Sequence, residues 1–588
     1  MRARLAAVLL ALFSAGAAAE PPVAWQAWSP KVFQQAQRQH RLVFLYLGAT
    51  WCHACHVMDN ATFADPAVRA ELRRHYVAVR VDHDANPGLA NRYRDWGWPA
   101  LVFLAADGEE LVKRAGYLGS EPFRRLLQAV ARDPTAEEAE ASEEEDATGA
   151  RAATEGLAEA QRAELEQRHD DSYDPVLGGL KLPLKFLDRD SVEYALALGA
   201  NGDAEEAHKA RQTLDAARAL LDPVWGGFYQ YSTEGDWHHP HFEKIMRVQA
   251  GALRTYALAY AQSQRPEDLK TALAVRDFLR DFLQDRSGAF YVSQDADLVP
   301  GRSAERYFAL PDAARRAQGM PRIDRSLYAQ ENGWAAEALA TLSEASGDAL
   351  ALQMATQAAN WALQNRALRG GGFRHGAHDR SGPYLGDTLA MARACLALYR
   401  VTAERPWLHC AEAGANFAIE HFRDEDGGFR SAAPDRTPVA PEPDLDENIS
   451  AARFFNLLSY YTGDAGLRGA AAHAMRYLAD PQLVSSRVEE AGILLADDEL
   501  ATDPPHFTVV GAKNDPAARA LYQAALRTPG WYQRVEWWDP KEGPLPNNDV
   551  PFPSQGRAAG YVCTGGRCSA PSFEPATYRL RIEALAGS

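Results

Sequence analysis

The chain has 588 residues, 46% of them hydrophobic, and a formal net charge of −17. This length exceeds one ordinary domain, so two to four domains with sizeable cores are expected. Because the charge is strongly negative, general binding to nucleic acid or to an anionic membrane surface is not expected.

A secretory signal peptide is predicted over residues 1–19. Arg2 and Arg4 precede a short apolar run, and Ala17-Ala18-Ala19 supplies an A-x-A cleavage site. The apolar run is too short to span a bilayer, and no later run of spanning length is apparent. We therefore expect a periplasmic or secreted protein in a compartment where disulfides are stable.

An alternating strand and helix pattern predicts an α/β domain over residues 20–132. Branched and aromatic residues at 43–47 form a buried-strand pattern that leads directly into two cysteines. Asp65-Pro66 suits a helix start, and Asp107-Gly108 suits a hairpin turn. The further elements expected are helices at 64–76 and 120–132 and strands at 76–82, 100–108 and 110–116.

The motif WCHACHVM, residues 51–58, is compatible with three chemistries. Cys52 and Cys55 have the C-x-x-C spacing of a redox pair, and His56 extends it to the C-x-x-C-H of a c-type haem. Two thiols and two imidazoles could also begin a zinc site. The local apolar residues form a sheet rather than haem walls, and no second ligand pair lies nearby in the sequence. We therefore predict thiol chemistry, with no metal and no cofactor.

The strand before the cysteines, the helix at them and the later Trp98-Pro99 resemble the thioredoxin family. A thiol at a helix N-terminus is stabilised as thiolate, so Cys52 is predicted to attack and Cys55 to resolve the mixed disulfide. His53 could add positive charge, whereas His56 is expected to cap or pack. By the resemblance, Pro99 would be a cis-proline that, with Trp51, contacts the substrate.

An acidic linker at 133–155 is expected to lead into an all-α domain at 156–500. Gly-Gly-Phe or Gly-Ala-Phe recurs after predicted helices, with room for a helix pair between successive copies. Such repeats predict a six-hairpin (α/α)6 toroid of the glycosidase type. The copies lie in the segments 221–230, 285–293, 368–375 and 424–431.

Toroid enzymes that act on sugars use carboxylates and histidines at the funnel mouth. Trp237, His241 and Glu243 follow the first clear Gly-Gly-Phe turn and are the predicted pocket residues. Helix capping and loop anchoring offer a non-catalytic explanation for the same residues. Other candidates near predicted helix starts are His238, His239, Asp295, Asp297, Glu331, Trp334, His375, Asp387 and Glu447.

Residues 501–588 are predicted to form a small α/β C-terminal region. Cys563 and Cys568 flank Thr-Gly-Gly-Arg, a loop flexible enough to close a structural disulfide, and a redox role for this pair stays open. Cys395 and Cys410 lie in neighbouring predicted helices as buried thiols or as a disulfide, which requires Cα atoms within about 7 Å.

The motifs CHACHVM (52–58), PHFEK (240–244), SQDAD (293–297) and YVCTGGRC (561–568) occur in one order along the chain. In the identity and order of these motifs, the chain resembles the spermatogenesis-associated thioredoxin-domain proteins and their bacterial relatives. That resemblance implies a thioredoxin-like domain fused to a six-hairpin toroid. The chain departs from the expected pattern at Arg247-Val248, where an acidic residue is expected soon after PHFEK.

Together these features predict an exported thiol–disulfide oxidoreductase that uses Cys52 and Cys55, with a toroid that binds a protein or glycan partner. A carbohydrate-active enzyme, glycosidase or sugar epimerase, with a structural or regulatory thioredoxin domain is the alternative. A third possibility is a binding protein without turnover.

Overall fold

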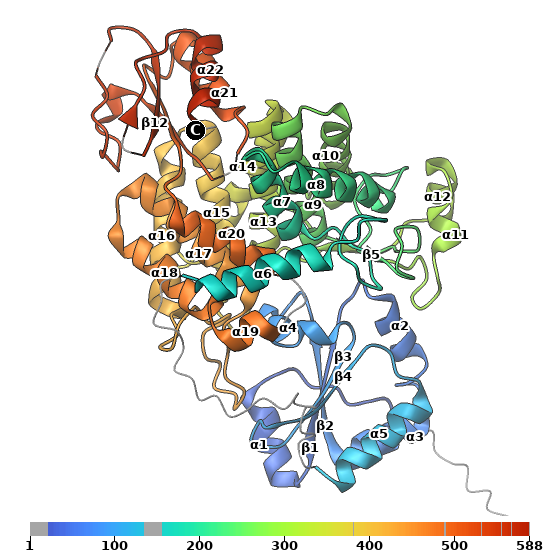
Figure 1. Cartoon of the computed structure of the whole chain (residues 1–588). Coiled ribbons are helices and arrows are strands. Elements are labelled where there is room, and N and C mark those ends of the chain that lie inside the picture. Colours follow the sequence, from blue (N-terminus) through green and yellow to red (C-terminus); the bar gives the residue numbers. More distant parts are fainter. Residues whose placement is uncertain are drawn as a thin grey trace, which may run out of the picture.

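The computed structural model describes residues 21–134, 156–379, 381–486, 490–530, 532–553, 555–565 and 567–586. The predicted signal peptide and most of the predicted acidic linker lie outside these residues. The described chain forms a thioredoxin-like domain, a ring of helices and a C-terminal α/β domain (Figure 1). Among the residues described, no helix combines the length and apolar character needed to cross a bilayer.

The first domain is built on a four-stranded sheet of order β2-β1-β3-β4. β1 is parallel to β2 and antiparallel to β3. Alternate residues of β1 face opposite sides, so Val43 and Leu45 pack towards α1 while Phe44 and Tyr46 pack towards α3 and α5. The elements are α1 (Pro30–Gln39), β1 (Leu42–Gly48), α2 (His53–Asn60), α3 (Pro66–His75), β2 (Tyr76–Asp82), α4 (Pro87–Arg92), β3 (Ala100–Leu104), β4 (Glu110–Ala115) and α5 (Ser120–Arg132).

The predicted elements of this domain are largely confirmed. Asp65 caps α3 through Ala67 N–H at 2.8 Å, as the sequence indicated. β3 is shorter than predicted, because Gly108 N–H donates to Ala105 C=O at 3.1 Å and the turn begins there. Trp98-Pro99 is a cis peptide, as the thioredoxin resemblance implied.

The second domain is an (α/α)6 toroid. Within the described residues, six inner helices contact one another in a closed ring, because α20 packs against both α17 and α7. The inner helices are α7 (Arg189–Ala200), α9 (Met246–Ser263), α13 (Ala329–Ser346), α15 (Leu385–Thr402), α17 (Leu445–Thr462) and α20 (Ala491–Ala501). The outer helices are α6 (Glu159–Ser172), α8 (Ala204–Ala217), α10 (Pro266–Phe278), α14 (Ala349–Asn365), α16 (Arg405–Phe422) and α18 (Ala465–Leu478).

Shorter elements decorate the loops on the side of the ring that faces the first domain. β7 pairs with β8, and β8 pairs with β9, in a three-stranded sheet. These elements are β5 (Tyr231–Ser232), β6 (Pro240–His241), β7 (Lys244–Ile245), β8 (Ser293–Gln294), α11 (Glu305–Phe308), α12 (Asp312–Gln318), β9 (Ile323–Asp324) and α19 (Pro481–Ser486).

The recurring Gly-Gly-Phe turns are held by side chains of the inner helix that follows each of them. In the last copy, Asn448 Oδ1 accepts from Phe429 N–H at 2.7 Å and Asn448 Nδ2 donates to Phe429 C=O at 3.0 Å. Gly428 has φ 76°, and a Cβ there would lie 2.8 Å from Asn448 Oδ1, which explains the glycine. The equivalent pairs are Gln249 with Phe228, Asn332 with Phe290 and, through a single hydrogen bond, Thr388 with Phe373.

The C-terminal domain repeats the connectivity of the first. Its sheet has the order β11-β10-β12-β13, with β10 parallel to β11 and antiparallel to β12. A helix follows the last strand in both domains, but within the described residues only α21 separates the two parallel strands here, whereas α2 and α3 separate them in the thioredoxin-like domain. Residues 511–514, which follow the first strand, contain no cysteine. The elements are β10 (His506–Val510), α21 (Pro516–Leu526), β11 (Arg534–Trp538), β12 (Ala559–Thr564), β13 (Arg567–Cys568) and α22 (Pro575–Ala586).

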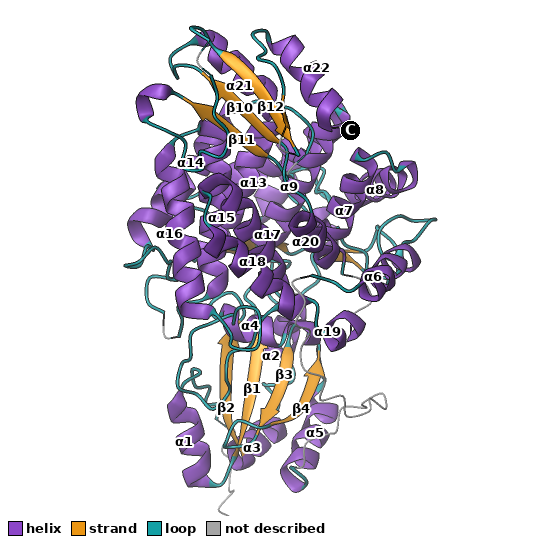
Figure 2. Cartoon of the chain, turned by 60° about the vertical axis from the view of Figure 1, so that its left-hand side comes forward, coloured by secondary structure: helices purple, strands orange, loops and turns teal. Residues whose placement is uncertain are grey.

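The two α/β domains lie at opposite ends of the toroid (Figure 2). At the far end, Tyr522 Oη donates to Arg400 C=O, and Tyr461 Oη accepts from Val535 N–H at 2.9 Å. At the near end, the edge of the thioredoxin-like sheet that carries the cysteines faces the N-terminal ends of the inner helices, the mouth of the funnel.

Candidate functional site

Cys52 and Cys55 form a disulfide at the start of α2. Cys52 is the N-cap residue of this helix, and its Sγ accepts a hydrogen bond from Cys55 N–H at 3.1 Å. The sulfur that we predict to attack therefore lies at the positive end of the helix dipole. Trp98, which precedes the cis-proline Pro99, packs against the cluster that contains the disulfide.

The toroid covers this disulfide. Cys52 and Cys55 are each only 3% exposed, and Ile245, the last residue of β7, packs against them. Trp51 is 2% exposed, and its backbone C=O accepts from Ala296 N–H of the toroid at 3.4 Å. The Cys52–Cys55 disulfide thus lies at the junction of two domains rather than on an open surface.

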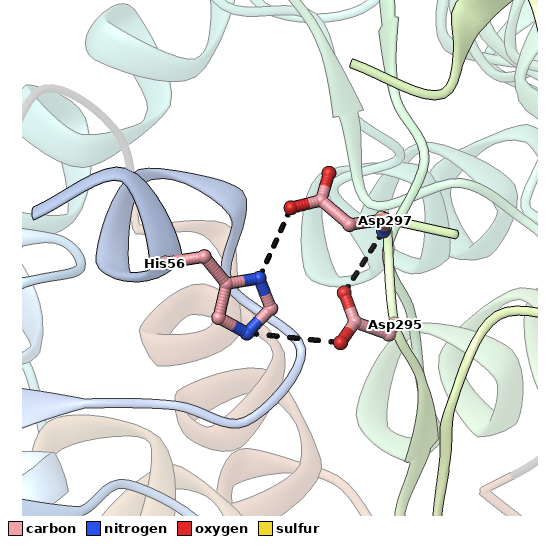
Figure 3. A group of neighbouring side chains, drawn as sticks. All are labelled: His56, Asp295 and Asp297. Atoms are coloured by element: carbon pink, nitrogen blue, oxygen red, sulfur yellow. Dashed lines mark hydrogen bonds and ion pairs between the residues drawn. The ribbon is translucent and has the colours of Figure 1, made fainter. Parts of the chain in front are cut away.

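Two histidines of the motif contact carboxylates of the toroid, and Figure 3 shows one of them, His56, beside Asp295 and Asp297. His53 Nδ1 lies 2.7 Å from Asp297 Oδ1, and His56 Nδ1 lies 3.0 Å from Asp297 Oδ2. His56 Nε2 lies 3.7 Å from Asp295 Oδ2 and 3.0 Å from Thr50 C=O. We call His53, His56, Asp295 and Asp297, together with the neighbouring Glu243, the junction cluster.

Burial and the neighbouring charges shift the pKa values of these side chains in opposite directions. Burial raises the pKa of Asp295 to about 6. Burial also acts to raise the pKa of Asp297, but hydrogen bonds from His53 and His56 outweigh it and lower that pKa to about 2. The hydrogen bond to Asp297 raises the pKa of His53, and for His56 the carboxylates outweigh the effect of burial and raise the pKa as well.

A second group of titratable side chains lies in the funnel mouth and is covered by the thioredoxin-like domain. It consists of Glu331, His375, Asp387 and Glu447, which we call the mouth cluster. His375 Nδ1 lies 2.9 Å from Asp387 Oδ1, and its Nε2 donates to the C=O of Asp84 in the first domain at 2.6 Å. All four side chains are buried.

The mouth cluster holds its protons unusually tightly. Burial raises the pKa of Glu331 to about 8 and raises those of Asp387 and Glu447 as well. Burial lowers the pKa of His375, but Asp387 and Glu331 outweigh it and bring the pKa to about 9. Carboxyl oxygens of Glu331, Asp387 and Glu447 have no hydrogen-bond partner.

Asp84 contacts both the cysteine motif, through Trp51, and the mouth cluster, through His375. Its Oδ2 accepts from Trp51 Nε1 at 2.8 Å, while its backbone binds His375. Thr50 Oγ1 donates to Asp324 of β9 at 2.7 Å. Asp84 and Asp324 are not among the residues that the sequence predicts, although Asp84 lies just beyond the end of β2 and so at the same sheet edge as the cysteines.

The three residues predicted to line the toroid pocket lie in different places. Glu243 belongs to the junction cluster, and His241 Nδ1 lies 3.9 Å from Glu243 Oε2 at the edge of it. Trp237 lies apart, because its buried indole donates to Leu177 C=O at 2.9 Å and packs on the turn at Gly179. In this structure Trp237 anchors a loop and is not brought to the cysteines.

Ion pairs fasten the domains beside the mouth. Arg94 lies 2.6 Å from Asp444 Oδ2 and 2.8 Å from Asp446 Oδ2. Arg247 also binds Asp446. The residue at which the sequence departs from the expected family pattern therefore takes part in the same interdomain network.

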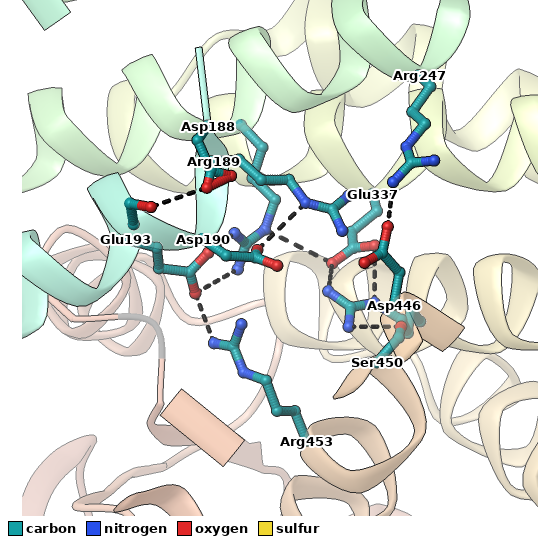
Figure 4. Close-up of polar contacts among 12 residues, drawn as sticks. Asp188, Arg189, Asp190, Glu193, Arg247, Glu337, Asp446, Ser450 and Arg453 are labelled. Carbon is teal, nitrogen blue, oxygen red and sulfur yellow. Dashed lines mark hydrogen bonds and ion pairs between the residues drawn. The ribbon is translucent and has the colours of Figure 1, made fainter. Parts of the chain in front are cut away.

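Further buried ion pairs fill the interior of the ring (Figure 4). Arg453 binds Glu193 at 2.5 Å and Glu499 at 2.7 Å, and Arg254 also binds Glu193. Arg254 and Arg453 outweigh burial and lower the pKa of Glu193. Because acidic and basic groups compensate one another here, this network is structural.

The other four cysteines are also paired. Cys395–Cys410 joins α15 to α16 with Cα atoms 5.9 Å apart, and both residues lie within the toroid. Cys563–Cys568 joins directly opposed residues of β12 and β13. The described chain contains no free cysteine.

Comparisons with known sequences match the first domain to a described protein family. A family model described as "Thioredox_DsbH: Protein of unknown function, DUF255" matches residues 15–150. Human spermatogenesis-associated protein 20 is 28% identical over 316 residues, 48% of this chain and 40% of that protein. The chain thus matches well under half the length of this relative. Thiol:disulfide interchange protein DsbD of Pectobacterium atrosepticum is 32% identical over 91 residues, 15% of this chain and 16% of that protein.

Solved structures resemble the toroid. A crystal structure of D-mannose isomerase has a TM-score of 0.46 and 14% identity, and covers 60% of this chain and 99% of that one. A family 76 glycoside hydrolase from a bovine Bacteroides thetaiotaomicron strain has a TM-score of 0.34 and 13% identity, and covers 50% of this chain and 55% of that one.

Proposed function

We propose that this chain is a thiol–disulfide oxidoreductase, because its first domain matches the Thioredox_DsbH family model and its C-x-x-C pair forms a disulfide at a helix N-terminus. The observation that carries the proposal is the position of Cys52. Its sulfur caps α2 and accepts a backbone N–H, an environment that stabilises the thiolate released during exchange.

The proposed step is exchange through a mixed disulfide. A substrate thiolate attacks Cys52 Sγ, the Cys52–Cys55 bond breaks and Cys55 leaves as the thiolate. A second substrate thiolate then attacks the substrate sulfur of the mixed disulfide and releases Cys52, so the substrate is oxidised by two electrons and the pair is reduced. The reverse sequence reduces a substrate disulfide.

The toroid makes this exchange conditional. A substrate protein cannot approach sulfurs that are 3% exposed and covered by Ile245. Exchange with a protein therefore requires the thioredoxin-like domain to move away from the funnel mouth, whereas a small thiol needs only local opening. The toroid in this proposal selects the partner by controlling access to the pair.

The proposed compartment is the periplasm or the exterior of the cell. The observation in favour is that all six cysteines are paired, which requires an oxidising environment to persist. Fractionation of cells that express the full chain, with detection of the processed N-terminus, tests this. Recovery of the unprocessed chain in the cytosol would contradict it.

An equilibrium redox titration against glutathione tests the function. The full chain is alkylated at each potential, and peptide mass spectrometry follows each of the three disulfides separately. We expect a reversible two-electron transition of Cys52–Cys55 while Cys395–Cys410, which is buried, stays oxidised. A Cys52–Cys55 pair that stays bridged at every potential at which the chain remains folded would overturn the proposal.

A carbohydrate-active toroid is the second candidate, and the mouth cluster is the observation that favours it. Glu331, Asp387 and Glu447 present buried carboxyl oxygens without hydrogen-bond partners, and a glycosidase uses a pair of carboxyl groups, one of them with a raised pKa. Cys52→Ser and Glu331→Gln variants separate the two candidates. Biological activity that survives the first change and is lost with the second, while the redox transition persists, would favour the sugar chemistry.

A further inference from the structure

We propose that the junction cluster binds a divalent transition-metal ion, with His56, Asp295 and Asp297 as protein ligands from two domains. One ligand atom of each residue lies within 4.8 Å of the others, a spacing at which a single ion reaches all three (Figure 3). Imidazole nitrogen and carboxylate oxygen are the donors that Zn²⁺ and Mn²⁺ accept. The proposal does not depend on the redox function, because neither cysteine is a ligand.

The junction cluster contains buried carboxylates whose negative charge a cation would compensate. Asp295, Asp297 and Glu243 are each at least 97% buried. Within the described residues, the ion pairs made by these three carboxylates involve only imidazoles and no lysine or arginine. Buried carboxylates require a compensating charge, which a metal ion or a protonated imidazole supplies.

The hydrogen bonds of His56 point to the same conclusion. Its Nε2 lies 3.0 Å from Thr50 C=O, which can only accept, so Nε2 carries the hydrogen. In the neutral ring Nδ1 is then a lone pair, and it faces Asp297 Oδ2 at 3.0 Å. A lone pair and a carboxylate oxygen repel unless a proton or a metal ion lies between them. An N–H donated to a backbone carbonyl is also the usual orienting contact of a metal-bound histidine.

Glu243 gives an independent indication of a ligand. It is 3% exposed, and its Oε2 has no hydrogen-bond partner; the one ion-pair contact recorded for it among the described residues is His241 Nδ1 at 3.9 Å. The ladder between β7 and β8 pairs Lys244 with Gln294, so Glu243 and Asp295 lie side by side one step beyond it. This carboxylate is positioned to complete the coordination of an ion held by Asp295.

A metal at this position would join the domains beside the disulfide. His56 belongs to α2, whereas Asp295 and Asp297 follow β8 of the toroid, about 240 positions later in the sequence. Removal of the ion leaves three buried carboxylates of the toroid facing the imidazoles of the thioredoxin-like domain. Metal binding should therefore hold the thioredoxin-like domain closed over Cys52 and Cys55.

The test is a calorimetric titration of Zn²⁺, with Mn²⁺ as second probe, into the oxidised full chain after treatment with a chelator. We expect one Zn²⁺ per chain, and Asp297→Asn to weaken binding by roughly 100-fold or more. A Cys52→Ser/Cys55→Ser double variant should keep full affinity, which excludes ligation by thiolates. Melting curves of each variant establish that it is folded.

Asp236→Asn is the matched control. Asp236 also contacts a histidine, His239 at 2.9 Å, but both side chains lie on the surface away from the junction. This variant should bind Zn²⁺ as the unchanged chain does. Absence of stoichiometric binding, or an equal loss of affinity in Asp236→Asn and Asp297→Asn, would overturn the proposal and leave a protonated His56 as the compensating charge.

Discussion

Replacing Arg94 by alanine should expose Cys52. Arg94 makes charge-assisted hydrogen bonds to Asp444 and Asp446 across the domain junction, and its side chain is 21% exposed. At this partial exposure each contact stabilises docking by about 1 kcal/mol. Loss of both, about 2 kcal/mol, raises the undocked population by roughly 30-fold, because 1.36 kcal/mol corresponds to a factor of ten.

The assay is the rate of alkylation of Cys52 in the reduced chain, resolved by peptide mass spectrometry. If docking and undocking are faster than alkylation, the rate follows the undocked population and rises by the same factor. Arg124→Ala is the control, because Arg124 pairs with Glu121 within α5 and does not reach the toroid. Equal alkylation rates for the unchanged chain and Arg94→Ala would refute the view that docking controls access to Cys52.

Three further changes test the toroid. Asn448→Ala leaves the N–H and C=O of Phe429 without partners, so the free energy of unfolding should fall by about 2–4 kcal/mol, measured as a lower melting temperature than that of the exposed control Asn365→Ala. Glu331→Gln tests the pH dependence of stability. Burial raises the pKa of Glu331 in the folded chain to about 8, from 4.5. The free energy of unfolding should therefore be greatest below pH 4.5 and fall as the pH rises towards 8, by roughly 3 kcal/mol between pH 5 and 8. The Gln variant should lack this loss in melting curves across that range, and an unchanged pH slope would contradict the assignment. The double variant Cys395→Ala/Cys410→Ala opens a loop with a sequence separation of 15, which should lower stability by about 3 kcal/mol, and a melting temperature equal to that of the unchanged chain would contradict this.

The elements of the first domain and the repeating turns of the toroid could be predicted because their signals are local. Asp65-Pro66 starts a helix wherever it occurs in such a pattern, and Gly428 has a backbone conformation that favours glycine. The same holds for Cys52 at the helix start. Each of these features depends on neighbours a few positions away.

The junction cluster could not be predicted as a unit. The sequence indicates His56 and Asp297 only as separate candidates, and it disfavours zinc because no second ligand pair lies near the cysteines. The carboxylates come from a toroid loop instead, and only the docking of the two domains brings them to the imidazoles. Docking is set by complementary surfaces, for which a single sequence carries no periodic signal.

The way the ring closes has a consequence for synthesis of the chain. The outer helix α6 begins the toroid, yet it packs on α20, which ends it, and Arg162 of α6 binds Asp498 at 2.5 Å while Leu157 N–H donates to Asp497 at 2.9 Å. A ribosome must therefore add more than 300 residues after α6 before that helix meets its partner. During this interval α6, whose buried residues are Leu165, His169 and Ser172, lacks the helix against which it packs.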